Sequence, residues 1–230
     1  MKSSPLIIVL SVFAAVTAHA GGKVIAPVSE SKAPITDAKA LIAEPTAPCL
    51  SYDYVDLEYL TTGSEGIFGG GDGYSASFSK SLGELFFLTG GYTNAGADYI
   101  DNNVAFDFES HRYQLGLGAR FALTECVHLT LEGGAEHADN RFGNTAFNYD
   151  SWAYYIGPGL RARAGRFEFF GEVFYVGREG VPGNGFAYEN DTWVFNPGVL
   201  FHLNDRLALK VAGSFTEDTS LFTFGARINF

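Results

Sequence analysis

This sequence has little of several residue types that other proteins use heavily. Its 230 residues include one Met, two Cys, and 15 Lys or Arg against 26 Asp or Glu, for a formal net charge of −11. The shortage of positive charge argues against nucleic acid and anionic lipid surfaces as partners, because both require clustered Lys and Arg. Two cysteines alone cannot make a zinc site. We therefore expect no metal and no cofactor.

Long apolar runs are also missing after the first residues. No later segment has the roughly 20 apolar residues that a membrane helix requires. The opening "MKSSPLIIVLSVFAAVTAHA" holds Lys2, an apolar stretch from Leu6 to Val16, and small residues at Ala18 and Ala20. This pattern predicts a signal peptide over residues 1–20. Residues 21–50 are rich in Ala and Pro and are predicted to form a flexible periplasmic tail.

From residue 51 to residue 230, apolar side chains recur at every second position, which is the period of a β-strand. The chain also has 15% aromatic residues and 28 Gly, which fit short strands and tight turns. We count ten candidate strands and keep eight as the alternative. They are expected at 52–61, 73–81, 85–92, 112–123, 127–137, 152–163, 166–176, 193–203, 207–215 and 221–230.

The connections between these strands alternate in length. Tight turns are expected near 82–83, 124–126, 164–165 and 204–205. Longer polar loops are expected at about 62–72, 93–109, 138–149 and 177–191, followed by a brief one at 217–218. Short turns at one end and long loops at the other predict a transmembrane antiparallel up-and-down β-barrel of the outer membrane. Pro158 and Pro197 fit this pattern only at a bulge or at the rim, because proline cannot donate to a strand ladder.

The two faces of the strands differ in chemistry. Aromatic and aliphatic side chains occupy one face, which we predict to contact lipid. The other face holds near-equal numbers of acidic and basic residues, which suits a narrow lumen where each desolvated charge needs a partner. The predicted lumen charge network consists of Asp56, Glu58, Arg112, Arg120, Glu132, Glu136, Arg161, Arg163, Glu168, Glu172, Lys210 and Arg227.

A soluble β-sandwich would show the same alternation with its charged face in water. It would not require the signal peptide, the alternating loop lengths and the final aromatic residue together. The closing stretch "LFTFGARINF" keeps its alternation to Phe230. In lipid an open sheet edge would leave unpaired backbone groups, so we expect the last strand to close against the first.

The segment "FTFGARINF" resembles the C-terminal β-signal of outer-membrane proteins, and residues 51–230, with phrases such as "DYVDLEYL" and "GLGARFAL", resemble the small OmpA-like and opacity-type barrels. The resemblance implies outer-membrane lipid, periplasmic chaperones and the barrel assembly machinery as partners. The chain departs from OmpA in having no peptidoglycan-binding domain after the barrel and ten expected strands in place of eight. The assembly-signal residues would be Phe222, Phe224, Ile228 and Phe230.

Three functions fit this picture. The first is a monomeric barrel with a charge-filled lumen in a structural or surface-interaction role, adhesion-like or receptor-like, with an unknown extracellular ligand. The second is a narrow porin or channel for small solutes. The third is a rim-site hydrolase built on His111, His137, Asp107, Glu109 and Asp139, although the sequence lacks the motif of a serine nucleophile or a metalloprotease and we expect no catalysis.

Aromatic residues near the predicted loops provide a surface for the first function or belong to an aromatic girdle. They are Tyr99, Phe106, Phe108, Phe142, Phe147, Tyr149, Phe186 and Tyr188.

The two cysteines lie at the predicted periplasmic end. Cys49 precedes the first strand and Cys126 lies in the turn between the fourth and fifth. Export permits a disulfide between them. The two positions are nearly half a circumference apart in a ring of ten strands, so the bond would draw the residues before Ser51 across the periplasmic opening and help to seal it.

Overall fold

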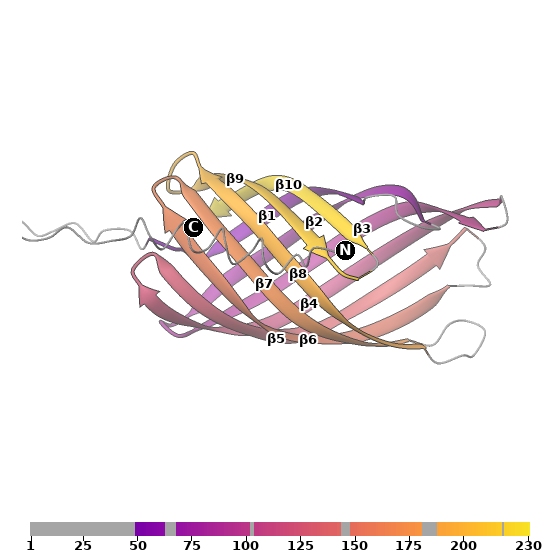
Figure 1. The fold of residues 1–230 in the computed structure, drawn as a ribbon, viewed down its shortest axis with the longest axis horizontal. Helices are drawn as coiled ribbons and strands as arrows, with labels where there is room; N and C mark the ends of the chain where they lie inside the picture. Colours follow the sequence, from indigo (N-terminus) through magenta and orange to yellow (C-terminus); the bar gives the residue numbers. More distant parts are fainter. Residues whose placement is uncertain (1–48, 63–67, 102–103, 144–147, 181–187, 218) are drawn as a thin grey trace, which may run out of the picture. The chain divides into compact units, whose positions relative to one another are not determined.

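The computed structural model describes residues 49–62, 68–101, 104–143, 148–180, 188–217 and 219–230; the expected signal peptide and most of the expected tail lie outside them. The described residues form a closed antiparallel barrel of ten strands, in which β1 pairs with both β2 and β10 (Figure 1). The predicted ten-stranded barrel is confirmed, and the eight-stranded alternative is excluded. None of the described segments is a helix with the length and apolarity needed to cross a bilayer.

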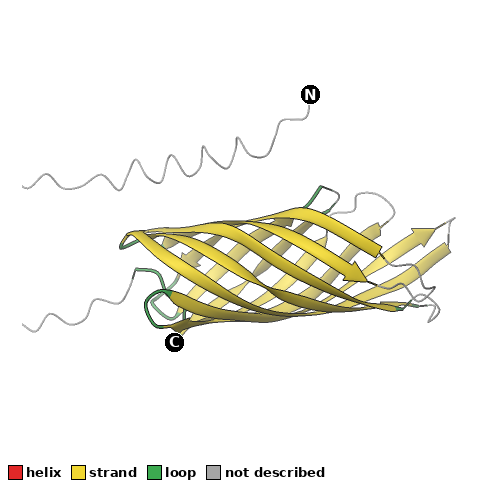
Figure 2. Ribbon diagram, turned by 90° about the horizontal axis from the view of Figure 1, so that it is seen from below, coloured by secondary structure: helices red, strands yellow, loops and turns green. Residues whose placement is uncertain are grey.

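The strands follow one another around the ring in chain order and alternate in direction (Figure 2). Their bounds are β1 (Tyr54–Thr62), β2 (Phe68–Leu82), β3 (Phe86–Asp101), β4 (Val104–Thr124), β5 (Val127–Phe142), β6 (Tyr149–Ala164), β7 (Phe167–Gly180), β8 (Tyr188–His202), β9 (Leu207–Phe215) and β10 (Ser220–Asn229).

Several strands run further toward the loop end than the sequence predicted. The expected loop at about 93–109 is mostly strand, because β3 continues to Asp101 and β4 begins at Val104. The pairing stays in register there, with Asn94 opposite His111. Polar residues hide the alternation in this part of the sequence, but strand pairing satisfies the backbone in water as well as in lipid. The loops expected at about 62–72, 138–149 and 177–191 are shortened in the same way by β2, β5, β6, β7 and β8.

The two prolines do not lie at a bulge or at the rim, so that expectation was wrong. Both are within strands whose register continues unchanged on either side of them. Pro158 is opposite Leu131 of β5 while the pairing of β6 with β7 skips it. Pro197 is opposite Gly171 of β7 while the pairing of β8 with β9 skips it. Each proline therefore interrupts the ladder on one side only, which a long strand can accommodate.

The turn end of the barrel is held by tight connections. Gly83 and Gly165 lie in two of the turns with φ of 80° and 61°, which side chains with a Cβ rarely adopt. Arg120 donates to the carbonyl oxygens of Glu84 at 2.7 Å and Gly83 at 2.8 Å, and so fixes the turn between β2 and β3. Under the usual asymmetry of bacterial barrels, this turn end faces the periplasm.

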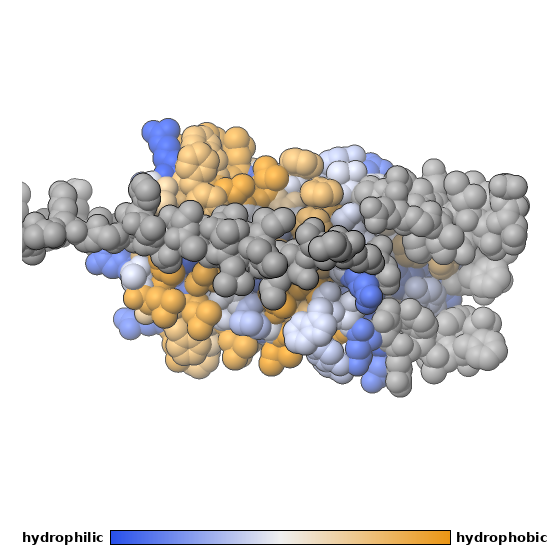
Figure 3. Space-filling model, in the orientation of Figure 1, coloured by the Kyte–Doolittle hydropathy of each residue, from blue (hydrophilic) through white to orange (hydrophobic). Residues whose placement is uncertain are grey.

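The outward face is apolar and ends in an aromatic girdle on each side. At the loop end the girdle consists of Tyr and Trp, including Tyr113, Trp152 and Trp193, the last with 63% of its surface exposed. At the turn end it consists of Phe, including Phe86 and Phe121. Figure 3 shows apolar side chains gathered along the wall, with hydrophilic residues beyond them.

Such a surface has no place in water, because large exposed apolar areas are costly there. A closed barrel has no unpaired edge, and its apolar outer band matches what lipid requires. The protein is therefore an outer-membrane β-barrel. The third strand, whose phase the sequence left ambiguous, fits the same rule: Phe86 points to lipid, whereas Phe87 points inward and is 4% exposed.

Candidate functional site

Buried charged and polar side chains are concentrated in the interior of the barrel. Inward-facing side chains divide it into two parts. We call the inner face of β6 to β10 and β1 the charged arc, because it supplies most of the buried ions. We call the inner face of β2 to β5 the glycine–serine arc, because small residues dominate it: Ser75, Ser77, Ser79, Ser81, Gly91, Gly116, Gly118 and Gly134.

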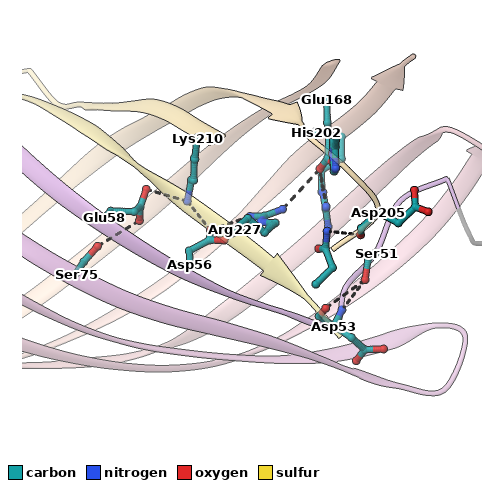
Figure 4. Close-up of polar contacts among 12 residues, drawn as sticks. Ser51, Asp53, Asp56, Glu58, Ser75, Glu168, His202, Asp205, Lys210 and Arg227 are labelled. Carbon is teal, nitrogen blue, oxygen red and sulfur yellow. Dashed lines mark hydrogen bonds and ion pairs between the residues drawn. The ribbon is translucent and has the colours of Figure 1, made fainter. Parts of the chain in front are cut away.

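The centre of the charged arc is Asp56 of β1. Arg227 of β10 lies opposite it in register and binds both of its oxygens, with Nε at 2.7 Å and Nη2 at 2.8 Å. Lys210 of β9 donates to the same carboxylate at 2.7 Å and reaches Glu58 at 3.0 Å (Figure 4). Asp56 is only 1% exposed, so its charge is balanced entirely by these two cations.

A second carboxylate, Glu168 of β7, extends this group. Arg161 of β6 donates Nε to it at 2.9 Å, and His202 of β8 approaches its other oxygen at 3.0 Å. Arg227 lies 3.7 Å from Glu168 and so joins the two carboxylates into one cluster, which Figure 4 shows from the side of β10. We call Asp56, Glu58, Arg161, Glu168, His202, Lys210 and Arg227 the ion network.

Two other predicted lumen acids lie outside the ion network and have other partners. Glu136 accepts a hydrogen bond from Gln114 at 2.7 Å and pairs with Arg178 at 3.1 Å. Glu132 accepts hydrogen bonds from the hydroxyls of Thr89 at 2.7 Å and Tyr155 at 3.3 Å.

The remaining acid, Glu172, also faces inward. Its strand neighbours across the ladders are Gly159 and Asn196. Within the described part of the chain Glu172 makes no hydrogen bond or ion pair. Glu132, which binds two hydroxyls, and Glu172 therefore both lack a direct ion pair with a cation.

Three predicted network cations form no ion pair with an acid among the described residues. Arg112 donates to Ser110 at 3.5 Å. Arg120 binds turn carbonyls, and Arg163 donates to the carbonyls of Cys49 at 3.0 Å and Gly165 at 3.1 Å. The alternation assigned these residues to the correct face. The alternation could not predict how far along the barrel axis each residue lies. At the ends of the strands, backbone carbonyl oxygens take the place of carboxylates as hydrogen-bond acceptors.

Aromatic rings fill the space in front of the glycine–serine arc. A Cβ placed on Gly118 would lie 2.1 Å from the ring of Phe87, and one on Gly116 would lie 2.3 Å from the hydroxyl of Tyr155. The glycines thus provide room for rings that project from neighbouring or facing strands. In this region the lumen is packed by side chains.

The turn end of the lumen is covered by a short segment, Cys49–Asp53, which we call the strap. A disulfide joins Cys49 to Cys126, with the Cα atoms 5.1 Å apart. Leu50 and Tyr52 are 3% and 2% exposed and form an apolar cluster with Phe87. The sequence assigned Leu50 to a flexible tail, and this assignment was wrong, because its side chain is buried inside the mouth.

Tyr52 shows that the strap crosses the opening. It lies two residues before β1, yet its ring is 4.9 Å from that of Phe87 and stacks on His128 at 5.8 Å. The guanidinium groups of Arg120 and Arg161 lie over the ring at 4.6 Å and 4.3 Å. Arg161 belongs to β6, which is opposite β1 in the ring. Burial raises the pKa of the Tyr52 phenol, which therefore stays neutral.

Asp53 anchors the other end of the strap. It accepts a hydrogen bond from the backbone N–H of Ser81 at 2.8 Å and pairs with Lys80 at 3.1 Å. Burial alone would raise its pKa, but the Ser81 N–H and the Lys80 ammonium hold the pKa of this carboxyl below its usual value.

The residues considered for a rim enzyme lie on the outer wall near the loop end. His111 shares a hydrogen bond with the hydroxyl of Tyr92 at 2.8 Å and contacts Glu109 at 3.2 Å. His137 packs on Trp152, and Asp139 pairs with Arg141. Asp107 is exposed. His111 is opposite Asp139 in the pairing of β4 with β5, with Glu109 and His137 next to them on the same outer face, so four of the five residues are neighbours. No cluster of His, Cys, Asp and Glu able to hold a metal occurs among the described residues.

The aromatic residues expected in loops are mostly in strands. Phe108 and Phe142 have ring centroids 4.9 Å apart, and Tyr149 begins β6. Tyr99, Phe106 and Tyr188 belong to β3, β4 and β8, whereas Phe147 and Phe186 lie outside the described residues. The expected assembly-signal residues Phe222, Phe224, Ile228 and Phe230 are all exposed on the outward surface.

Sequence reasoning missed several lumen residues. His202 binds Glu168 of the ion network, Arg178 binds Glu136, and Tyr54 lies under Arg227 at 3.5 Å. A signal was available for His202, because it follows Leu200 by two positions on the inward face of β8. Tyr52 was assigned to the strand expected at 52–61, but β1 begins at Tyr54, so the strap position of Tyr52 was not predicted.

No protein-family model matches this chain, and no curated protein matches it. Solved structures similar to it are outer-membrane β-barrels. An outer membrane channel from Pseudomonas putida F1 has 10% identity and a TM-score of 0.47 over 85% of this chain and 100% of that one. The translocator domain of the autotransporter NalP from Neisseria meningitidis has 9% identity and a TM-score of 0.44 over 78% and 89%. Ail, the attachment invasion locus protein of Yersinia pestis, has 11% identity and a TM-score of 0.35 over 78% and 100%.

Proposed function

We propose that this protein is a non-conducting outer-membrane barrel whose lumen is filled by its own side chains, in a structural or surface-interaction role. One observation carries the proposal: the ion network joins six neighbouring strands while Asp56 and Glu168 are each only 1% exposed. A solvated pore would leave such carboxylates in contact with water. Here each is satisfied by cations from other strands, as a packed interior requires.

The glycine–serine arc supports the same function from the other side of the lumen. Phe87 and Tyr155 occupy the space that side chains at Gly118 and Gly116 would take. Charged groups fill one part of the lumen and rings fill the other, so a continuous water path is not expected. The surface at the loop end would then perform the surface-interaction role, and its ligand would be extracellular.

Planar-bilayer recording of refolded, oxidised protein tests this proposal. We expect no stepwise openings above the lipid-only baseline. Electrophoresis without heating should show in the same preparation that the protein is folded, by its heat-dependent shift in mobility. Regular openings from such a folded preparation would refute the filled barrel.

A narrow channel is the second candidate, and one observation favours it. Glu132 and Glu172 face the lumen and form no direct ion pair among the described residues. If openings do occur, unpaired carboxylates would make them prefer cations. Glu172→Gln should then reduce the preference for potassium over chloride, whereas Asp72→Asn on the outer wall should leave it unchanged.

The same proposal includes no catalytic role. His111 is held by Tyr92 and Glu109 on the outer wall, and no described residue near it is placed as a nucleophile beside an oxyanion site. As partners we propose outer-membrane lipid, periplasmic chaperones and the barrel assembly machinery, with the protein acting as a monomer. Kinship with OmpA-like and opacity-type barrels is part of the proposal and rests on the sequence phrases alone.

A further inference from the structure

The strap is joined to the barrel by few contacts apart from the disulfide. Its buried side chains are Leu50 and Tyr52. Its polar anchors are the Cys49 carbonyl on Arg163 and Asp53, which binds Ser81 and Lys80 and accepts from the Phe230 N–H. Ordering five backbone residues costs about as much free energy as burying two side chains gains. The position of the strap is therefore nearly balanced without the disulfide, and the covalent bond decides it.

The disulfide lies where a reductant can reach it. Cys49 and Cys126 are both partly exposed at the turn end, next to the exposed turn residue Glu125. By contrast, the Tyr52 hydroxyl that the disulfide helps to hold is buried and has no hydrogen-bond partner among the described residues. Released from the strap, that hydroxyl would regain water, which favours departure.

We propose that the strap is a redox-controlled lock on the periplasmic mouth, closed when Cys49 and Cys126 are joined and released when they are reduced by a periplasmic dithiol. One thiolate of the dithiol attacks a sulfur of the Cys49–Cys126 bond and forms a mixed disulfide, while the other cysteine leaves as a thiolate. The second thiol of the reductant then displaces the remaining cysteine. Two electrons and two protons pass to Cys49 and Cys126, and the reductant becomes a disulfide.

Release has a definite consequence for the residues beneath the strap. Tyr52 would leave the space between Arg120, Arg161 and His128, and Arg163 would lose the Cys49 carbonyl. The mouth would change from an apolar cover to a ring of positive side chains open to the periplasm. The lock is an inference beyond the filled barrel of the proposed function. It rests on that function in one respect, because it requires that the oxidised barrel be closed.

Hydrogen exchange with mass spectrometry tests the lock directly. We expect reduction with dithiothreitol to raise exchange at least tenfold in the peptide that contains residues 49–53, and to raise it at Ser81, whose N–H binds Asp53. Peptides from the middle of β5 and β8 should not change. The double variant Cys49→Ser, Cys126→Ser should show the fast exchange with or without reductant. Equal exchange of the strap in oxidised and reduced protein would overturn the proposal.

A second measurement separates the lock from the filled lumen. The variant Tyr52→Gly keeps the disulfide but removes the ring. With the Cys49–Cys126 bond intact, an anionic maleimide added from the periplasmic side should then modify Thr130→Cys, a buried position opposite Arg120, faster by tenfold or more than it does with Tyr52 present. Unchanged modification after removal of the ring would mean that the strap covers nothing. Openings in oxidised wild-type protein would instead refute the proposed function and leave the exchange result standing.

Discussion

The charged arc and the glycine–serine arc line the same lumen, but they fill it by different means. In the charged arc, acids and bases from six strands balance one another, and Asp56 and Arg227 form a bidentate pair. In the glycine–serine arc, missing side chains make room for rings such as Phe87. The charged arc depends on each member because removal of one leaves a buried charge. The other arc depends on shape, so small polar changes there should be tolerated.

The largest effect should come from the charged arc. Arg227→Ala removes the cation that binds both oxygens of Asp56 and joins it to Glu168. We expect a loss of about 3–5 kcal/mol in the free energy of unfolding, because two carboxylates stay buried with less compensation. Urea unfolding in lipid vesicles would measure it. Arg112→Ala is the matched control, since among the described residues Arg112 makes one long hydrogen bond, to Ser110 at 3.5 Å, and no ion pair. A loss of equal size there would contradict the distinction between the arcs.

An intermediate effect is expected where the glycine–serine arc depends on shape. Gly118→Ala places a methyl group against the Phe87 ring, and overpacking of this kind costs about 1–3 kcal/mol. Gly96→Ala is the control, because its nearest atom would be at an ordinary contact distance of 3.6 Å. Adding Phe87→Ala should make Gly118→Ala nearly neutral in a double-mutant cycle. If the two changes are additive instead, the ring does not occupy the glycine's space.

The smallest effect concerns single hydroxyls of the glycine–serine arc. Ser79 is fully buried, and its hydroxyl has no hydrogen-bond partner among the described residues. Ser79→Ala should therefore leave the free energy of unfolding unchanged or raise it slightly, by less than about 0.5 kcal/mol. Ser110, equally buried, donates to Asn140 at 2.9 Å, and Ser110→Ala should cost about 1 kcal/mol. The same urea series would rank the two, and the reverse order would show that Ser79 has a hidden partner.

The two-residue alternation determined which side of each strand faces lipid, and this much of the interior could be predicted. Asp56, Glu168 and Arg227 follow from it directly. Their partners do not, because pairing depends on how far a strand has shifted along its neighbour and on residues far away in the chain. Arg120 and Arg163 illustrate the limit: the alternation placed them inward, but they lie at strand ends and bind carbonyl oxygens.

Strand ends were harder to predict than strand centres. Within lipid the apolar period marks a strand clearly, whereas above it polar residues such as Asn94 and His111 pair without that signal. The strap was foreseen in outline, since the positions of the two cysteines required a crossing of the mouth. The burial of Tyr52 between Arg120 and Arg161 was not foreseen, because the sequence placed Tyr52 in a strand that begins only at Tyr54.

The pair Asp56–Arg227 also bears on the order in which the barrel folds. Its members are 171 residues apart and face each other across the seam between β1 and β10. Contacts so distant in the chain form late, because the intervening chain must be ordered first. Until the seam closes, Asp56 and Arg227 are mutually unpaired charges on the first and last strands of an open sheet. Their attraction can therefore guide the two edges into the register that puts Asp56 opposite Arg227, because a one-residue slip of either strand would turn its charge toward lipid and leave the other unpaired in the lumen.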